Sequence, residues 1–365
     1  MKFPDRANQY YPGLDGLRGI SCLIVVLTHN FGFSHFFEYG WLGVDLFFVI
    51  SGFLITNILL DTLESKNYLS SFYVRRILRI FPLYYLILII FIFILPQINS
   101  FGENLQYFVR NQWWFWLYGQ NWLLIFNFPK GAEHLNHFWS LAVEEQFYLV
   151  WPFLVLWLKT SRRLIIFIVS ALVGLFLVRS FLWYLQIDHF NYTLFYRFTR
   201  VDGIFIGALC AAIYRLRKNL ISENIAVAAT ILAVLNFLFY FLNRSNHFNY
   251  PYLAYIGYTT FSALLGLLLN EIIQNKSRWL QFMFTFPLLR FVGKISYGLY
   301  AIHWPAFYMT HDWLFHLFQN RMGLSGPVST YSASICATAL GFILSILSYY
   351  YFERKFLNLK KRFKY

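Results

Sequence analysis

Arg18 and His29, which lie in one apolar segment, are the first residues of this sequence whose types and spacing suit catalysis. Along a helix, the eleven steps between them return to within about 20° of the same direction and rise about 16 Å. The two side chains therefore share one face, and the histidine lies deeper in the segment. Imidazole titrates near neutral pH, so His29 is suited to take the proton of a hydroxyl group as a general base.

A second basic feature is Arg75-Arg76-Ile77-Leu78-Arg79, which stands just before Phe81-Pro82. Residues three or four apart lie on one side of a helix, so Arg79 can converge with Arg75 or Arg76 on one anion. Guanidinium groups match phosphate oxygens in pairs, so a ligand with several phosphates suits these arginines. The alternative is ordinary positive charge at the cytoplasmic end of a membrane helix, and spacing alone does not separate the two.

Acidic side chains form a third feature. Glu144 and Glu145 are adjacent inside an apolar run, where two carboxylates are hard to explain as structure. One of them, placed near His29, could orient the imidazole and stabilise its protonated form. Asp45 is a rival for this role, and a buried ion pair or a helix cap is the alternative for each acid.

Three further ionisable residues lie in apolar surroundings. His303 precedes Trp304-Pro305, and a proline kink frees backbone carbonyls that the ring N–H could satisfy. We therefore expect His303 to be structural. Arg179 and Glu271 are equally ambiguous, and we assign them no role.

The cysteines suggest packing rather than chemistry. Cys22, Cys210 and Cys336 lie far apart, with neither CxxC nor Cys/His spacing. No disulfide framework and no metal site are expected from this pattern.

The elements that must position these residues are long apolar runs. Of the 365 residues 59% are hydrophobic and 13% are charged, with a mean hydropathy of +0.51, whereas soluble domains carry about 25% charged residues. This composition excludes a soluble globular protein. Runs of about 20 apolar residues cross a membrane as helices, because the backbone finds no water partners there.

The sequence predicts an all-α integral membrane protein with about ten transmembrane helices. The expected spans are 18–33, 41–60, 75–95, 137–158, 164–185, 200–215, 223–242, 252–273, 291–317 and 331–351. Ten spans place both termini on one side, and 23 of the 30 Lys and Arg residues fall on that side against six on the other. The cationic side is cytoplasmic, so both termini are expected in the cytoplasm.

The net charge of +14 follows from this topology and from contact with anionic lipid. The basic residues are divided among six short segments rather than gathered on one face, so nucleic acid is not an expected partner. Segment 97–136 contains Asn111-Gln112-Trp113-Trp114-Phe115-Trp116 and Asn121-Trp122, and we expect an aromatic-rich segment at the outer interface. No linker or repeat divides residues 1–365, which are expected to form a single membrane domain.

In their order along the chain, these motifs resemble the acyltransferase-3 family of integral-membrane O-acyltransferases, which modify bacterial surface glycans. The resemblance extends over nearly the whole chain. It rests on Gly13-Leu14-Asp15-Gly16-Leu17-Arg18-Gly19 with His29, Gly43-Val44-Asp45-Leu46-Phe47-Phe48, Arg76-Ile77-Leu78-Arg79, Phe138-Trp139-Ser140-Leu141-Ala142-Val143-Glu144-Glu145-Gln146-Phe147-Tyr148, Arg200-Val201-Asp202-Gly203 and Ile295-Ser296-Tyr297-Gly298-Leu299-Tyr300-Ala301-Ile302-His303-Trp304-Pro305.

The resemblance implies that His29 is the catalytic histidine, that Arg18, Arg76 and Arg79 serve acyl-CoA, and that Glu144 matters for activity. It also implies acetyl-CoA as the usual donor, with no permanently bound cofactor, and a glycan acceptor outside the bacterial inner membrane. The extracytoplasmic esterase-like domain of some relatives is not expected here. Neither the acceptor nor the oligomeric state follows from the sequence.

Two mechanisms and two functions stay open at this stage. Direct transfer would use His29 as general base with Glu144 or Asp45 as its orienter, whereas a covalent route would pass through acyl-His29 or an acyl-tyrosine at Tyr148 or Tyr300. A membrane transporter or flippase is the alternative function, because carriers also contain intramembrane charges. The shared face of Arg18 and His29 and the ordered motifs favour the acyltransferase.

Overall fold

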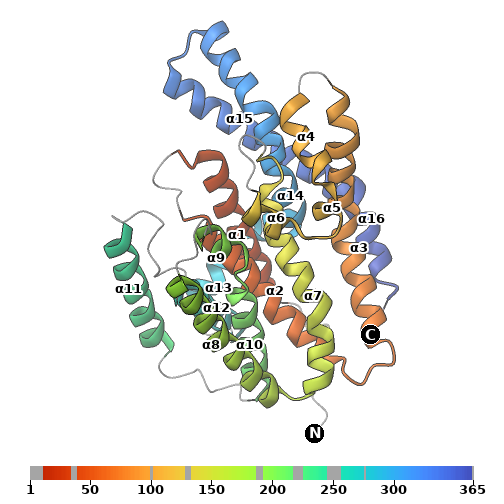
Figure 1. Cartoon of the computed structure of the whole chain (residues 1–365), viewed down its shortest axis with the longest axis vertical. Coiled ribbons are helices and arrows are strands. Elements are labelled where there is room, and N and C mark those ends of the chain that lie inside the picture. The colour runs from red at the N-terminus through yellow and green to blue at the C-terminus, as the bar shows by residue number, and fades with distance from the viewer. Residues whose placement is uncertain are drawn as a thin grey trace. The chain divides into compact units, whose positions relative to one another are not determined.

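A computed structural model of the chain describes residues 11–33, 39–98, 102–127, 133–185, 192–216, 225–244, 256–274 and 277–363. Both termini, and part of the expected span 252–273, lie outside the described residues. The described residues are helical throughout their regular structure and contain no β-strand, as the apolar runs predicted. The helices follow one another as shown in Figure 1: α1 Pro12–Phe31, α2 Trp41–Asp61, α3 Tyr68–Ile89, η2 Ile90–Ile94, η3 Leu95–Gln97, α4 Gly102–Arg110, α5 Gln112–Trp116, α6 Gln120–Phe126, η5 Asn136–Phe138, α7 Trp139–Leu158, α8 Ser161–Leu185, α9 Tyr192–Phe198, α10 Asp202–Leu216, α11 Ile225–Arg244, α12 Tyr258–Gln274, α13 Arg278–Phe284, α14 Pro287–His316, η8 Leu317–Arg321, α15 Gly326–Leu347, η9 Ser348–Glu353 and α16 Arg354–Lys360.

Five helical stretches of the described chain are long and apolar enough to cross a membrane. They are Trp41–Asp61, Tyr68–Gln97, Asn136–Leu158, Ser161–Leu185 and Gly326–Lys360. Helices α10 and α12 are shorter, at 15 and 17 residues, and a straight crossing of the hydrocarbon core takes about 20. The count of ten spans therefore stays a prediction.

Helix α8 shows most directly why the chain needs a lipid environment. Its side chains Ile166, Val173, Leu177 and Phe181 are all more than half exposed. A continuous apolar surface of this kind on a 25-residue helix would be unfavourable in water. In a lipid bilayer this apolar surface carries no such cost, because hydrocarbon tails are as apolar as the side chains.

The aromatic-rich stretch forms the three short helices α4, α5 and α6. Trp113, Trp114 and Trp122 are exposed on it, as are Leu117 and Phe126. Amphipathic rings of this kind suit the border between lipid and water. The position of this stretch at the outer interface stays a prediction.

The chain divides into two compact units, and helices α1, α2 and α7 contribute residues to both. The first unit consists of Met1–Leu17, Asp45–Tyr68 and Val143–Phe286, and the second of Arg18–Val44, Leu69–Ala142 and Pro287–Tyr365. In the first unit, α2 packs directly on α10, where a Cβ on Gly52 would overlap the carbonyl of Ile204. In the second, α1 packs on α14, where a Cβ on Gly19 would overlap the carbonyl of Leu289. Small residues at such crossings let helix backbones approach closely in a membrane.

Candidate active site

Two histidines from opposite ends of the chain meet in the second unit. His29 lies in the last turn of α1, and His303 lies near the middle of α14. The Nδ1 atom of His29 is 2.8 Å from Nε2 of His303. The ring planes differ by 4° with centroids 5.1 Å apart, so the rings meet edge to edge in one plane, as a linear hydrogen bond requires.

The hydrogen bonds assign the tautomers of both rings. His303 Nδ1 lies 2.9 Å from the carbonyl oxygen of Leu299, which can only accept, so Nδ1 carries the proton. Nε2 of a neutral His303 is then an acceptor, and His29 must donate from Nδ1. The lone pair of His29 consequently lies on Nε2, which is the arrangement that a general base requires.

His137 is the third ring of this cluster. It lies in η5, with its centroid 6.3 Å from that of His29 and 5.3 Å from that of His303, nearly perpendicular to both. His137 and His303 are buried, whereas His29 is half-buried. His29 is therefore the member of the cluster that a substrate can reach.

The segment that carries His137 is held rigidly against α14. The Tyr300 hydroxyl donates to the backbone carbonyl of His137 at 2.7 Å and lies 2.6 Å from Ser140 Oγ. Indole Nε1 of Trp304 donates to the carbonyl of Glu133 at 3.0 Å. These bonds fix the position of the histidine cluster by tying η5 and α7 to α14 at several points.

The Trp304 ring lies against this cluster, and Tyr308 and His134 lie beyond it. The Trp304 ring lies 4.3 Å from that of His29, which limits the space around the imidazole. The Tyr308 hydroxyl donates to Glu133 Oε2 at 2.8 Å. Burial lowers the pKa of His134 to about 4, so this ring is neutral at physiological pH.

The arginines expected to bind CoA also belong to the second unit. Arg75, Arg76 and Arg79 lie on α3, Arg18 lies on α1, and all four are half-buried. Arg76 and Arg79 are three residues apart on α3, so they lie on one side of that helix. The convergence of these two arginines with Arg18 on one ligand stays a prediction.

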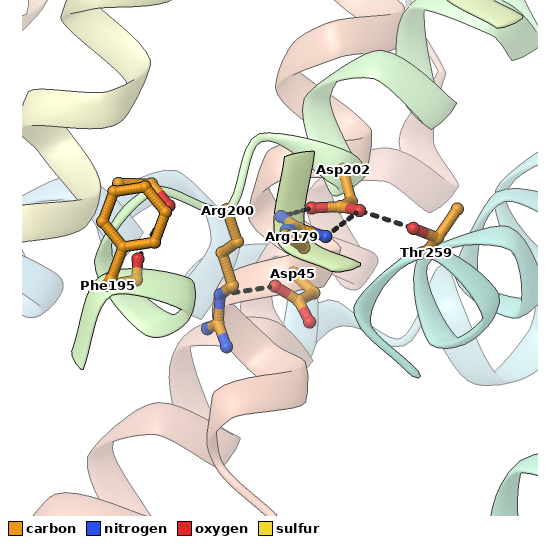
Figure 2. Close-up of polar contacts among 7 residues, drawn as sticks. Asp45, Arg179, Phe195, Arg200, Asp202 and Thr259 are labelled. Atoms are coloured by element: carbon orange, nitrogen blue, oxygen red, sulfur yellow. Dashed lines mark hydrogen bonds and ion pairs between the residues drawn. The ribbon is translucent and has the colours of Figure 1, made fainter. Parts of the chain in front are cut away.

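The two carboxylates expected near His29 have partners in the first unit. Glu144 Oε1 accepts from Ser51 Oγ at 2.8 Å, and Oε2 accepts from the Tyr148 hydroxyl at 3.3 Å. Asp45 Oδ1 lies 3.1 Å from Nε of Arg200, in a buried ion pair drawn in Figure 2. The orienting role of either carboxylate toward His29 stays a prediction.

A second buried ion pair lies beside the first. Arg179 donates to both carboxylate oxygens of Asp202, at 2.9 and 2.7 Å, and Thr259 donates to Oδ1 at 2.5 Å (Figure 2). The side chains of Arg179 and Asp202 are 3% and 1% exposed. A bidentate, fully hydrogen-bonded pair is the form in which two charges are tolerated within a membrane domain. This pair explains why Arg179 stands alone in the apolar run of α8.

Two members of the cluster, His137 and His303, received no catalytic role from the sequence. His303 was expected to be structural, and its Nδ1 does bond to the backbone, but its Nε2 also holds His29. The available signal was the occurrence of two histidines in separate apolar segments, each of which would be costly alone. Among the described residues, no group of three or more His, Cys, Asp or Glu side chains is arranged to hold a metal ion.

Comparison with known proteins identifies the family of this chain. A model of the acyltransferase-3 family, described as an acyltransferase domain, matches residues 11–350. The peptidoglycan O-acetyltransferase OatA of Listeria monocytogenes is 30% identical over 319 residues, which cover 83% of this chain and 50% of the relative. The putative peptidoglycan O-acetyltransferase YrhL of Bacillus subtilis is 30% identical over 323 residues, covering 82% and 49%.

A putative O-acetyltransferase of Staphylococcus aureus is 28% identical over 371 residues, covering 95% of this chain and 57% of the relative. The chain thus spans about half the length of the curated relatives that it matches. No solved structure matches significantly. Because the family model extends over nearly the whole sequence, the chain belongs to the acyltransferase-3 family.

Proposed function

We propose that the chain is a membrane O-acyltransferase that moves an acyl group, most simply acetyl, from cytoplasmic acyl-CoA to a hydroxyl of an extracytoplasmic glycan. The observation that carries the proposal is the hydrogen-bonded pair of His29 and His303 in the same unit as the arginines of α1 and α3. Relatives named as peptidoglycan O-acetyltransferases support a glycan acceptor. In this proposal the protein lies in the bacterial inner membrane with both termini in the cytoplasm.

Donor binding is assigned to the arginines. Arg18, Arg76 and Arg79 would hold the phosphates of CoA, because guanidinium groups bind phosphate oxygens through paired, charge-assisted hydrogen bonds. Arg18 and His29 lie on one continuous helix, eleven residues apart, so the thioester must reach about 16 Å beyond the arginine to meet the histidine. An extended CoA arm is long enough for this.

Direct transfer follows from the tautomers. Nε2 of His29 takes the proton of the acceptor hydroxyl while the hydroxyl oxygen attacks the thioester carbonyl. The tetrahedral adduct that forms then collapses and expels the CoA thiolate. The proton on His29 then neutralises the thiolate, which leaves as free CoA. His303 holds His29 through Nδ1 during both steps, in the position that an acid occupies in a hydrolase triad.

The covalent route and the transport function have less support. The Tyr300 hydroxyl donates to the carbonyl of His137, so it is engaged in positioning that segment rather than presented as a nucleophile. Tyr148 lies 3.3 Å from Glu144 Oε2 and stays the candidate for an acyl-tyrosine. A transporter or flippase is not favoured, because the relatives are named as acetyltransferases.

The test is acyl transfer by the purified protein in liposomes, with radiolabelled acetyl-CoA and a glycan acceptor. His29→Ala should bind acetyl-CoA normally yet lose at least the 10²-fold typical of a lost general base. The matched control is His316→Ala, since His316 is an exposed histidine at the end of α14. Near-normal transfer by His29→Ala would reject the assignment, and failure of the intact protein to bind acetyl-CoA would reject the donor.

A further inference from the structure

A row of aromatic rings leads away from His29 along α14. Trp304, Phe307 and His311 are three and four residues apart, so they lie on one side of that helix. The ring centroid of Trp304 lies 4.3 Å from that of His29, Phe307 lies 5.7 Å from Trp304, and His311 lies 4.6 Å from Phe307. All three side chains of this aromatic row are half-buried, so each keeps some surface that a ligand can contact.

The aromatic row lies on the far side of His29 from Arg18. Helices α1 and α14 run in the same direction, because Gly19 packs near the start of α14 whereas His29 bonds further along it, to His303. Helix α1 ends within one turn after His29, but α14 continues to His316. The row therefore extends beyond α1, away from the arginine that the proposed function assigns to the donor.

Carboxylates border the row at both ends. Glu133 Oε2 accepts from the Tyr308 hydroxyl at 2.8 Å, and the Tyr308 ring lies 4.7 Å from that of Trp304, at right angles to it. At the other end, Nδ1 of His311 lies 3.3 Å from Oδ1 of Asp312, whose side chain is 93% exposed. A carboxylate with this exposure is costly in hydrocarbon, so this end of the row faces water rather than lipid.

This combination of rings and carboxylates suits a sugar. A sugar ring carries C–H groups, which pack on aromatic surface, and hydroxyl groups, which donate to carboxylate oxygens. A lipid tail would use the rings alone, and Glu133 and Asp312 would repel a phosphate. Aromatic surface with a few polar groups is the usual lining of a small-molecule site.

From this arrangement we propose that the aromatic row, with Glu133 beside it, is the acceptor subsite, where a sugar ring of the glycan lies while one of its hydroxyls reaches His29. The inference rests on the proposed function, because it takes a glycan as the acceptor. It places the acceptor on α14 beyond His29, so that donor and acceptor approach the imidazole from opposite ends. Phe307 and His311 then set how tightly the acceptor binds, rather than acting on the proton.

The experiment is steady-state transfer from labelled acetyl-CoA to chitotetraose by the full chain in nanodiscs. This N-acetylglucosamine tetramer is the probe because relatives are named as peptidoglycan O-acetyltransferases. Phe307→Ala should raise KM for the tetramer about tenfold, because it removes ring surface from the acceptor subsite. Its kcat and its affinity for acetyl-CoA should stay within about twofold of wild type. Phe307→Tyr keeps a ring and should restore KM to within about twofold.

The matched control is Trp313→Ala. Trp313 is 66% exposed and follows Trp304 by nine residues, which places it on the opposite side of α14. Its removal takes a larger ring from the same helix and should leave KM unchanged. His311→Ala, at the water-facing end of the row, is a second test that does not depend on the stability of Phe307→Ala, and it should also raise KM.

The possible failures are distinguishable. If wild type acetylates the tetramer, and both Phe307→Ala and His311→Ala keep the wild-type KM, the acceptor subsite is overturned while the proposed function stands. A lowered melting temperature with that unchanged KM would mark the rings as packing or lipid contacts. An equal rise in KM for Trp313→Ala would also overturn the subsite, because the effect would not depend on the side of the helix. If wild type transfers no acetyl group to the tetramer, the proposed function fails first.

Discussion

Replacing His303 tests the histidine pair more sharply than any other substitution. His303→Ala removes the acceptor that holds Nδ1 of His29 at 2.8 Å, but leaves His29 itself in place. His303→Gln retains a side-chain oxygen that can reach toward the same nitrogen. If this hydrogen-bond acceptor matters, the alanine variant should be impaired, and the glutamine variant should recover much of the lost turnover.

The size of the effect follows from the charge that develops on His29. When His29 takes the hydroxyl proton, its bond to His303 becomes charge-assisted, and such bonds contribute about 1.5–3 kcal/mol. Each 1.36 kcal/mol is a factor of ten in rate, so His303→Ala should lower kcat about 10- to 150-fold. The loss should stay below that of His29→Ala, and the double variant should be no worse than His29→Ala, because both changes remove one function.

The assay is single-turnover transfer of labelled acetyl groups, measured beside acetyl-CoA affinity and the apparent melting temperature. His303 is buried, so alanine also leaves a cavity, and the melting temperature shows how much that cavity destabilises the protein. Unchanged donor affinity with a reduced kcat would support a positioning role. A kcat within twofold of wild type for His303→Ala, or equal impairment of the alanine and glutamine variants, would refute it.

Three other outcomes are expected. Asp202→Ala should lower the free energy of unfolding by about 3–5 kcal/mol, because it leaves Arg179 buried without a counter-charge. In thermal unfolding, the double variant with Arg179→Met should lose less stability than Asp202→Ala alone. An equal or larger loss in the double variant would contradict the ion-pair account. Glu144→Gln keeps the shape of the side chain that Ser51 contacts and removes its charge. Acetyl transfer should fall about tenfold or more if this carboxylate assists the base. Unchanged transfer would leave Glu144 with a structural role only. A cysteine introduced at Lys159 should react with an impermeant reagent only after the cells are opened, whereas one at Asn104 should react in intact cells, and the reverse pattern would overturn the topology.

Local geometry explains what the sequence could predict. A continuous helix through Arg18 and His29 and the clustering of Arg76 with Arg79 both depend on residues within a few turns of one another. The structure confirms that helix, since α1 runs from Pro12 to Phe31, and it places Arg76 and Arg79 on the single helix α3. Helical periodicity was sufficient for both.

Contacts between distant segments could not be predicted in the same way. His29 and His303 are 274 residues apart, and their pairing depends on how α1 and α14 pack. The close approach of those helices at Gly19 is visible only once both are placed. Likewise, the apolar run around Arg179 indicates a buried partner, but only the packing of α8 near α10 identifies Asp202.

The pairing of Arg179 with Asp202 has a consequence for how the protein is made. An unpaired arginine costs about 2.5–3.5 kcal/mol at the centre of a membrane helix on insertion scales, and less toward the end, where Arg179 lies in α8. Helix α8 emerges from the ribosome before α10, so Arg179 is synthesised before the acid that neutralises it. Long apolar flanks such as Ile166 to Val178 can carry the helix into the bilayer until then. We therefore expect α8 to be held in the bilayer more firmly once α10 has been made and Asp202 has paired with Arg179.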